Sequence, residues 1–326
     1  MLNLVRILGR RSLFATARAD SRLLHSPLLD DRALARIATR VAQHRHSAAA
    51  RRPTRFRHAG DCPSARLGQG LDYEEARPYQ PGDDMRSMDW RSTARTGRPY
   101  LKVYREAHEP ALHLVIDRGP SMRFGTRTRL KVTQAVRLAA ALAFDAGHTH
   151  ASVGATLWEP DGAVMPAGTG IDFCLRLLRA AAAPCPPSAG PFRAPQWTPA
   201  RLARRLSVAV PRDARVVMIS DFRTLNEQDR PVLSELAARY QLHAVQVLDS
   251  VELDLPAIGP VRFRDCATGT AAEMDTADPD LRARYRHWSR HRHAQQREWL
   301  ASAGVRVHEC STETDPCALV PGISGS

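Results

Sequence analysis

The sequence has few of the features that mark the common classes of enzyme and membrane protein. Its longest apolar run, residues 138–144, is far shorter than the roughly 18 residues of a transmembrane helix. It holds no Walker loop, no His-Glu-x-x-His pair and no Gly-x-Ser-x-Gly elbow, which excludes those ATPase, protease and hydrolase sites. Its six cysteines show no Cys-x-x-Cys pair and no zinc-type spacing with histidine. We therefore expect buried thiols in a reducing cytoplasm.

Lysine is scarce, and the positive charge is unevenly spread. Only two of the 47 basic residues are lysines, Lys102 and Lys131, and the formal net charge is +13. Residues 1–57 carry thirteen arginines against three aspartates, so most of the excess charge lies in this first segment. The segment is either a solvated arm or a contact for nucleic acid or an anionic membrane. Its first 19 residues, which lack acids, also have the composition of a transit peptide.

The rest of the composition is that of a soluble globular chain. Hydrophobic residues make up 43% and charged residues 25%, and 326 residues can bury a sizeable core. Leu34, Ile37 and Val41 recur at helical spacing in the first segment. The predicted division is a basic helix and linker at 1–60, a distinct segment at 61–110, a main domain at 111–315 and a tail at 316–326.

From residue 112 onward, strand patterns alternate with helix patterns. Such alternation predicts an α/β fold, a doubly wound and mostly parallel sheet with helices on both faces, interrupted by a small β excursion. Ligands bind such sheets outside the carboxyl ends of the strands. The predicted strands lie at 112–117, 152–158, 163–165, 215–220, 242–248 and 305–309. The predicted helices lie at 129–147, 170–183, 198–206, 227–240 and 279–303.

Two of the predicted strands end in an acid, at Asp117 and Asp221. If both strands are central and parallel, the carboxylates converge at one edge, where paired acids indicate a divalent cation or an acid–base pair. The tight turn after Asp117 brings the Ser121 hydroxyl near it. Thr169 either adds a third oxygen ligand or only caps the following helix. These oxygen donors suit Mg²⁺, with Mn²⁺ or Ca²⁺ as alternatives.

The segment before the main domain is rich in turn and charge signals. Pro81-Gly82 suits a type II turn, after which Asp83 or Asp84 caps a short helix that runs through Met85, Met88 and Trp90. The segment either holds itself together through ion pairs or presents a recognition surface for a partner. The strand at 100–105 adds to the main sheet or forms the edge of a small subdomain. The candidate ion pairs join Arg77, Arg91 and Arg95 to Asp83, Asp84 and Asp89.

The acids and hydroxyls of the main domain resemble the metal-ion-dependent adhesion site of von Willebrand factor type A domains. The family pattern is Asp-x-Ser-x-Ser, a later Thr and a final Asp. Asp117, Ser121 and Asp221 match this pattern, and Thr169 is assigned by position. Gly119 stands where the pattern has its first serine, and it brings no oxygen. The resemblance therefore implies a degenerate site, in which a water fills the vacant place or Arg118 offsets the Asp117 charge.

Residues 68–106 (GQGLDYEEARPYQPGDDMRSMDWRSTARTGRPYLKVYRE) resemble the hallmark of the bacterial domain of unknown function 58 family. That family joins such a segment to a type A-like domain. The runs GTRTRLK, ISDF and RDCATGTAAEMDT also resemble it, so the likeness extends from about residue 60 to 315. The residues singled out in the hallmark segment are Arg77, Tyr79, Pro81, Gly82, Asp83, Asp84, Asp89, Trp90 and Arg95.

The resemblance implies a cytoplasmic, non-catalytic interaction module that partners a MoxR-type AAA+ ATPase and acts on an unknown client protein. A carboxylate of the partner would complete the metal site. One alternative is a metal-dependent phosphoesterase that uses Asp117 and Asp221, with His113 or His148 as its base. The other is a nucleic-acid-binding protein that uses the basic arm and the basic helix at 279–303. In that helix, the spacing of Leu281, Tyr285, Trp288 and Trp299 indicates a face that packs on the core.

Overall fold

The computed structural model describes residues 6–8, 25–51, 67–80, 85, 88–105, 111–159, 162–185, 198–264 and 271–325. The chain divides into two compact units. The smaller contains residues 47–110 and the larger contains residues 1–46 and 111–326. In the described part of the chain, no helix is long and apolar enough to span a bilayer.

A six-stranded sheet, with the order β11-β8-β7-β4-β5-β6, forms the centre of the larger unit. The first five strands in this order are parallel, and the edge strand β6 is antiparallel to β5. The chain moves outward from β4 through β5 to β6, and then outward from β7 on the other side. This is a doubly wound order whose direction reverses between β4 and β7, and the predicted α/β class is confirmed. The strands are β4 (Leu112–Asp117), β5 (Val153–Trp158), β6 (Val164–Gly168), β7 (Arg215–Ser220), β8 (Gln241–Leu248) and β11 (Arg306–Ser311).

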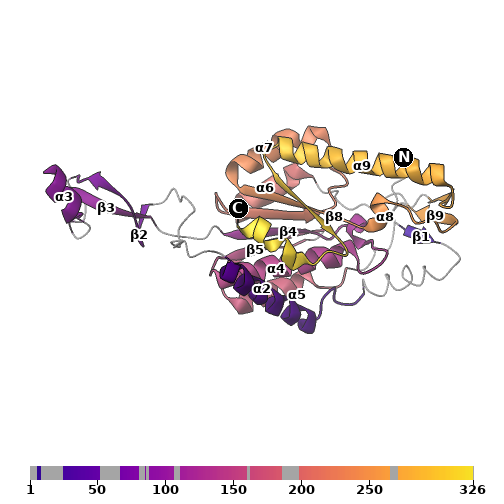
Figure 1. Ribbon diagram of the computed structural model, residues 1–326, viewed down its shortest axis with the longest axis horizontal. Helices are drawn as coiled ribbons and strands as arrows, with labels where there is room; N and C mark the ends of the chain where they lie inside the picture. Colours follow the sequence, from indigo (N-terminus) through magenta and orange to yellow (C-terminus); the bar gives the residue numbers. More distant parts are fainter. Residues whose placement is uncertain are drawn as a thin grey trace. The chain divides into compact units, whose positions relative to one another are not determined.

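Helices cover both faces of this sheet (Figure 1). One face packs against α2, α4 and α5, and the other against α6, α7 and α9. The alanine-rich α4 is buried along most of its length, because its small side chains let it lie close to the sheet. The helices are α2 (Asp31–Arg51), α4 (Lys131–His148), α5 (Ile171–Ala181), α6 (Pro199–Ala209), α7 (Arg230–Arg239) and α9 (Pro279–Ser302).

The first helix and the last segment of the chain share the core of the larger unit. The apolar stripe of α2, with Leu34 and Ile37, is buried against the same cluster as α4. The Asp30 side chain begins α2 by accepting a hydrogen bond from the Ala33 N–H at 2.7 Å. After β11, the short helices η5 (Pro316–Ala318) and α10 (Val320–Ser324) return to this core. Residues 31–46 and 316–325 therefore pack on the main domain.

A small antiparallel sheet accounts for the predicted β excursion. After β8, the chain forms α8 (Ser250–Leu253), and its strands β9 and β10 then pair with β1 in the order β1-β9-β10. Val251, Leu255, Val261 and Phe263 form a separate buried cluster beneath it. The three strands are β1 (Arg6–Leu8), β9 (Pro260–Arg264) and β10 (Ala271–Asp275).

The smaller unit contains a two-stranded antiparallel sheet, β2 (Leu67–Pro78) with β3 (Tyr100–Arg105), and the helix α3 (Trp90–Thr96). The strand at 100–105 is thus the edge of a small subdomain. The predicted helix through Met85, Met88 and Trp90 is wrong in position. Met88 instead forms a β-bridge with Leu101, and the helix α3 begins at Trp90, directly after its capping residue Asp89. The Asp89 carboxylate accepts from the N–H groups of Arg91 and Ser92 at 3.2 and 3.3 Å.

The hallmark residues lie in or just after β2, at the cap or within α3, or outside the described residues. Arg77 belongs to β2, and the Tyr79 N–H donates to the Pro99 carbonyl at 2.9 Å. Trp90, at the start of α3, is 70% exposed, and Arg95 is exposed in its last turn. The turn and capping predictions for Pro81, Gly82, Asp83 and Asp84 fall on residues outside the described ranges.

Four of the six cysteines lie in the described ranges, and all four are buried free thiols, as predicted. Burial raises the pKa of each of these thiols above its ordinary value. They therefore act as small apolar side chains in the core. They are Cys174, Cys185, Cys310 and Cys317; Cys62 and Cys266 lie outside the described ranges.

Candidate functional site

The two acids that end predicted strands lie at the ends of neighbouring strands. β4 and β7 pair in parallel, with Ile116 opposite Ile219, so Asp117 and Asp221 follow at the same edge. The Ser220 hydroxyl donates to Asp117 Oδ2 at 2.6 Å and joins the two strand ends. Each aspartate is only 5% exposed. Both acids therefore lie at the carboxyl edge, at the point where the strand order reverses.

Among the described residues, the hydrogen-bond donors to Asp117 are uncharged. Besides the Ser220 hydroxyl, the Gly119 N–H donates to its Oδ1 at 2.7 Å. Burial, and secondly the charge of Asp221, raise the pKa of Asp117 to about 7, and these hydrogen bonds offset the rise only in part. A Cβ at Gly119 would lie 2.9 Å from Asp117 Oδ1, a contact too close for the present arrangement. Glycine at this position is therefore explained by the close approach of the carboxylate.

Asp221 has a charged partner that the sequence analysis did not include. The Lys131 ammonium donates to Asp221 Oδ2 at 2.9 Å and to Glu252 Oε1 at 2.6 Å, and the lysine side chain is fully buried. Phe124 covers it with its ring centroid 6.0 Å from Nζ. Burial alone would lower the pKa of Lys131, but the charges of Asp221 and Glu252 outweigh burial and raise it. The ammonium is therefore a permanent positive charge between two carboxylates.

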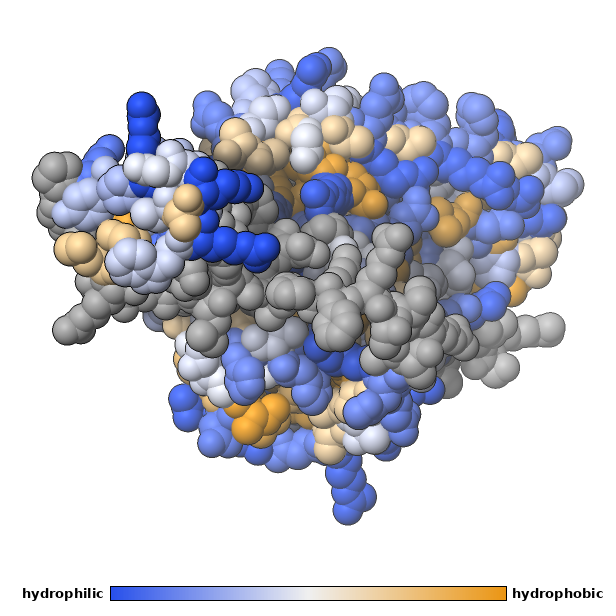
Figure 2. Space-filling view, turned by 60° about the vertical axis from the view of Figure 1, so that its left-hand side comes forward, coloured by the Kyte–Doolittle hydropathy of each residue, from blue (hydrophilic) through white to orange (hydrophobic). Residues whose placement is uncertain are grey.

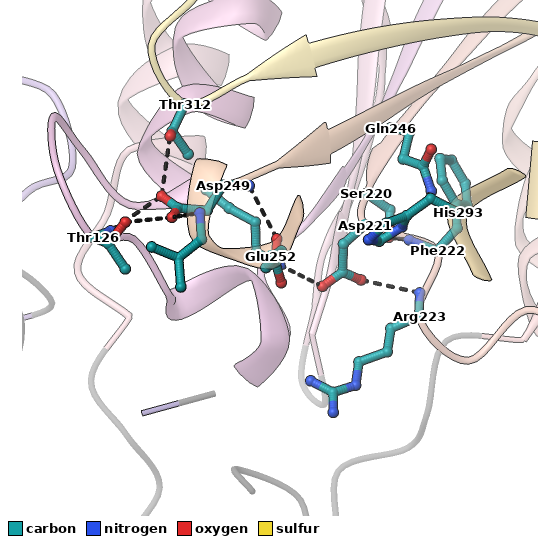
Figure 3. A network of polar contacts seen from close by, with 12 residues as sticks. Thr126, Ser220, Asp221, Phe222, Arg223, Gln246, Asp249, Glu252, His293 and Thr312 are labelled. Carbon is teal, nitrogen blue, oxygen red and sulfur yellow. Dashed lines mark hydrogen bonds and ion pairs between the residues drawn. The ribbon is translucent and has the colours of Figure 1, made fainter. Parts of the chain in front are cut away.

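The same contact reverses the effect of burial on Asp221. Burial is the largest single influence on Asp221 and would raise its pKa, yet the pKa is lowered because the charge and hydrogen bond of Lys131, together with the Arg223 charge, outweigh burial. The Ser121 hydroxyl hydrogen-bonds to Asp221 and lowers its pKa further, so this serine serves Asp221 rather than Asp117. The Arg223 N–H donates to Asp221 Oδ1 at 3.1 Å, while its guanidinium points away from the carboxylate (Figure 3).

Thr169 lies at the opposite edge of the sheet, so its predicted place beside Asp117 is wrong. Because β6 is antiparallel to β5, Gly168 pairs with Val153 at the amino end of β5. Asp117 pairs with Trp158 at the carboxyl end, five residues along the strand, or about 16 Å. Thr169 is exposed, and α5 begins after Gly170. The antiparallel direction of the edge strand was not predicted, and it accounts for the error.

A further buried carboxylate, that of Asp249, lies beside Glu252 (Figure 3). Asp249, which follows β8, is fully buried, and it accepts hydrogen bonds from the hydroxyls of Thr126 and Thr312. It also accepts from the N–H groups of Thr126 at 3.1 Å and Val251 at 3.2 Å. Asp249 therefore joins the loop before α4 to the ends of β8 and β11.

The GTRTRLK run, residues 125–131, forms that loop and is fixed from both sides. A Cβ at Gly125 would lie 2.2 Å from the Arg129 carbonyl oxygen, so the loop closes only with glycine. The Arg129 guanidinium donates to Gln134 Oε1 at 2.9 Å and to the Thr312 carbonyl at 2.8 Å. This run thus ties together the carboxyl ends of β7, β8 and β11. The scarcity of lysine was the one signal in the sequence that could have drawn attention to it.

The sequence left open that Arg118 offsets the Asp117 charge, but in the structure its guanidinium is engaged elsewhere. Its guanidinium is 2% exposed and pairs with Glu159 at 3.2 Å through Nε. Its other nitrogens donate to carbonyl groups at the end of α5, where a positive charge is favourable. Arg118 thus anchors α5 beside the edge. The accepting carbonyls belong to Ala180, Ala181, Ala183 and Pro184.

The residues at this edge do not fit a divalent cation in the arrangement observed. An ammonium already lies between Asp221 and Glu252, Gly119 supplies no oxygen, and Thr169 is at the other edge. In the described ranges, no group of three or more His, Cys, Asp or Glu side chains is arranged to hold a metal ion. A positive charge is nevertheless present, and the protein itself supplies it.

The two histidines considered as catalytic bases are far from the acids. His113 lies four residues before Asp117 in β4, about 13 Å along the strand. Its buried ring hydrogen-bonds to the Thr156 hydroxyl at 2.8 Å, and burial lowers its pKa to about 4. His148 ends α4, which begins at Lys131, so about 25 Å of helix separates them.

The basic helix α9 uses several of its arginines within the protein. Arg286 pairs with Asp254 at 3.1 Å, and Arg297 pairs with Glu309. Arg292 donates to the Arg223 carbonyl at 3.0 Å. The prediction of a core-facing side is correct for Leu281, Tyr285 and Trp299, which are partly buried against apolar clusters, and wrong for Trp288, which is 47% exposed.

Comparison with known proteins agrees with the segment resemblance. Residues 75–296 match the family model described as protein of unknown function DUF58. Uncharacterized proteins of Mycobacterium tuberculosis and Mycobacterium bovis are 36% identical over 225 residues, which span 66% of this chain and 66% of theirs. The crystal structure of the conserved hypothetical protein BatB from Bacteroides thetaiotaomicron is similar at 12% identity and a TM-score of 0.42, covering 66% of this chain and 98% of that one. The chain belongs to the DUF58 family.

Proposed function

We propose that the chain is a non-catalytic protein-interaction module whose docking surface is the carboxyl edge around Asp117 and Asp221. The observation that carries this proposal is their position at the reversal of strand order between β4 and β7. Open α/β sheets bind their ligands at this point, because the connecting loops diverge there. The family resemblance names the partner as a MoxR-type AAA+ ATPase that acts with the chain on a client protein.

The surface around this edge favours a polar contact. Arg127 is 64% exposed in the loop before α4, and Thr128 beside it is also exposed. Of the exposed large apolar residues of the larger unit, Ile171 lies in α5 and Val208 in α6, whereas Leu253 and Trp288 lie on α8 and α9, which pack on each other. Figure 2 shows a different face, with the amino ends of the strands turned forward, and hydrophilic residues also dominate its coloured part. Charge complementarity is therefore the expected basis of recognition.

The positions of the histidines weigh against the phosphoesterase alternative. A general base must reach the reacting group within hydrogen-bonding distance or through one water. His113 and His148 lie far from Asp117 and Asp221, and the His113 ring is bonded to Thr156. We expect no turnover of generic phosphomonoester or phosphodiester substrates in Mg²⁺ or Mn²⁺. Turnover that Asp221→Asn abolishes would restore the alternative.

For nucleic-acid binding through α9, the internal use of Arg286, Arg292 and Arg297 reduces the number of charges available to phosphates. Binding of this kind would weaken steeply with salt. Absence of binding to duplex and single-stranded oligonucleotides at low salt is therefore the expected result. Seven of the thirteen arginines of the first segment lie outside the described residues.

The docking proposal is tested by the affinity for a MoxR-type ATPase of the same organism. Arg127→Glu reverses an exposed charge at the carboxyl edge. Arg212→Glu is the matched control, because Arg212 is exposed before β7 at the amino edge. We expect Arg127→Glu to weaken binding about tenfold and the control to leave it unchanged. Equal binding by both variants, or no binding by the wild type, would remove the proposal.

A further inference from the structure

We infer that the Lys131 ammonium is the resident cation of this edge, so that the carboxyl-edge site works without a divalent metal and becomes a metal site only when that ammonium is removed. The identity of the cation does not depend on the proposed function. Its consequence, that partner docking does not depend on divalent metal, rests on the proposed function.

The first support is the position of Lys131 among the acids. Its side chain is fully buried, and its Nζ is 2.9 Å from Asp221 and 2.6 Å from Glu252. Isolated charges are costly to bury, and a pair is stable inside a protein only if the remaining hydrogen-bonding positions are satisfied. The acids therefore have a permanent counter-charge that no ion from solution needs to supply.

The second support is the choice of lysine in a chain that otherwise uses arginine. Lys131 is one of only two lysines among 47 basic residues. An ammonium is a compact point charge with three donors, whereas a guanidinium is a broad planar group suited to paired carboxylate contacts. The compact ammonium resembles a metal ion in size, and here it lies between a carboxylate that follows β7 and one that belongs to α8. The chemistry of the position, rather than the composition of the chain, accounts for the lysine.

The third support is the set of oxygens that would remain without the ammonium. Asp221 and Glu252 both contact the ammonium directly, at 2.9 and 2.6 Å, so their oxygens lie on either side of the place that it occupies. The Ser121 hydroxyl hydrogen-bonds to Asp221, and the Ser220 hydroxyl to Asp117. Carboxylates and hydroxyls are the donors that Mg²⁺ and Mn²⁺ prefer. Replacing Lys131 by methionine, which has a similar length but no charge, therefore leaves a negative oxygen-lined site.

The test measures the binding of Mn²⁺ alone by electron paramagnetic resonance, in which the free ion is counted directly. The wild type is expected to bind no Mn²⁺ at this edge. Lys131→Met is expected to bind one ion per chain, with an affinity at least tenfold above any Mn²⁺ binding by the wild type. Adding Asp221→Asn to Lys131→Met should abolish that binding. The matched control is Lys102→Met, which changes the second of the two lysines of the chain, in β3, and it should behave as the wild type.

Two results would overturn the inference. One is Mn²⁺ binding by the wild type that Asp221→Asn removes, since the ion would then already be the resident cation. The other is a folded Lys131→Met that binds no Mn²⁺. If the methionine variant does not fold, Lys131→Gln takes its place, because it keeps a hydrogen-bond donor without the charge. No partner is present in this titration, so its failure is distinct from a failure of docking, which the ATPase-binding assay in EDTA measures separately.

Discussion

The ends of β4 and β7 differ in the charge that faces their acids. Asp117 and Asp221 are equally buried and lie on adjacent parallel strands, yet the pKa of Asp117 is raised and that of Asp221 is lowered. Asp117 accepts hydrogen bonds from an N–H and a hydroxyl, whereas Asp221 also faces the Lys131 ammonium. A counter-charge on the first residue of α4, 90 residues from Asp221 in the sequence, therefore accounts for the difference between two acids that are equally buried in the sheet.

Removing the Lys131 ammonium should change the stability of the protein more than any other substitution at these two strand ends. Lys131→Met leaves Asp221 and Glu252 buried without their counter-charge, and we expect the free energy of unfolding to fall by about 3–5 kcal/mol. Urea denaturation measures the loss. Arg179→Met is the control, because it breaks a solvent-exposed pair with Asp31 and should cost far less stability than Lys131→Met. Similar losses in the two variants would contradict the proposed role of the buried pair.

The next largest effect is expected at Asp249, the buried carboxylate beside Glu252 that joins the loop before α4 to the ends of β8 and β11. Asp249→Asn replaces a carboxylate that accepts four hydrogen bonds with an amide that cannot accept them all. The expected loss in the free energy of unfolding is about 2–3 kcal/mol, because buried donors lose charged partners. Thr312→Val removes one of these donors and should cost about 1 kcal/mol. A smaller loss for Asp249→Asn than for Thr312→Val would show that Asp249 does not hold these segments together.

A change at the end of β4 should have a moderate effect. Gly119→Ser restores the hydroxyl of the adhesion-site pattern, but its Cβ would lie 2.9 Å from Asp117 Oδ1. We expect an unfolding free energy lower by about 1–2 kcal/mol, the usual cost of crowding a packed site. Thermal denaturation with and without Mg²⁺ measures the loss. A serine variant that Mg²⁺ stabilises would mean that the missing hydroxyl alone had prevented metal binding.

The smallest expected effect is the pH dependence that Asp117 contributes. Because its pKa in the folded protein is raised to about 7, the folded state holds a proton that the unfolded chain releases at lower pH. Its contribution to stability is therefore full below the unfolded pKa of about 3.9 and is lost as pH rises through the folded pKa.

Comparison of the wild type with Asp117→Asn isolates this contribution from the buried histidines. Relative to the variant, the wild type should lose about 1 kcal/mol between about pH 6.5 and pH 8, since one pKa unit corresponds to about 1.4 kcal/mol. Denaturation midpoints of both proteins at these pH values measure the difference. Parallel curves would mean that the pKa of Asp117 is not raised.

The sequence predicted the fold well because each element carries its own pattern. The buried runs before Asp117 and Asp221 and the alanine-rich stripe of α4 are local signals, and local signals set the doubly wound order. The direction of β6 is not local, since a short strand at an edge pairs either way, and so Thr169 was misplaced. Asp89 was missed as a cap because Asp83 and Asp84 compete with it in the sequence.

The candidate site was predicted only in half. The acids were visible because they directly follow buried strands. Their partner Lys131 was not, because it lies 90 residues from Asp221 in the sequence, and Glu252 lies 121 residues from Lys131. Such contacts arise from packing and leave no periodicity in the sequence. Gly119, which looked like a lost ligand, is instead explained by the space that the Asp117 carboxylate occupies.

The central claim, that the cation at this edge is an ammonium, is tested most directly by NMR of the protein labelled with ¹⁵N-lysine. The chain has only two lysines, so the Nζ signal that disappears in Lys131→Met is assigned at once. We predict that this signal remains that of a charged ammonium at about pH 10.5, because the pKa of Lys131 is raised. It should also be the same in excess Mg²⁺ and in EDTA. A neutral amine at that pH, or a signal that moves when Mg²⁺ is added, would contradict the account.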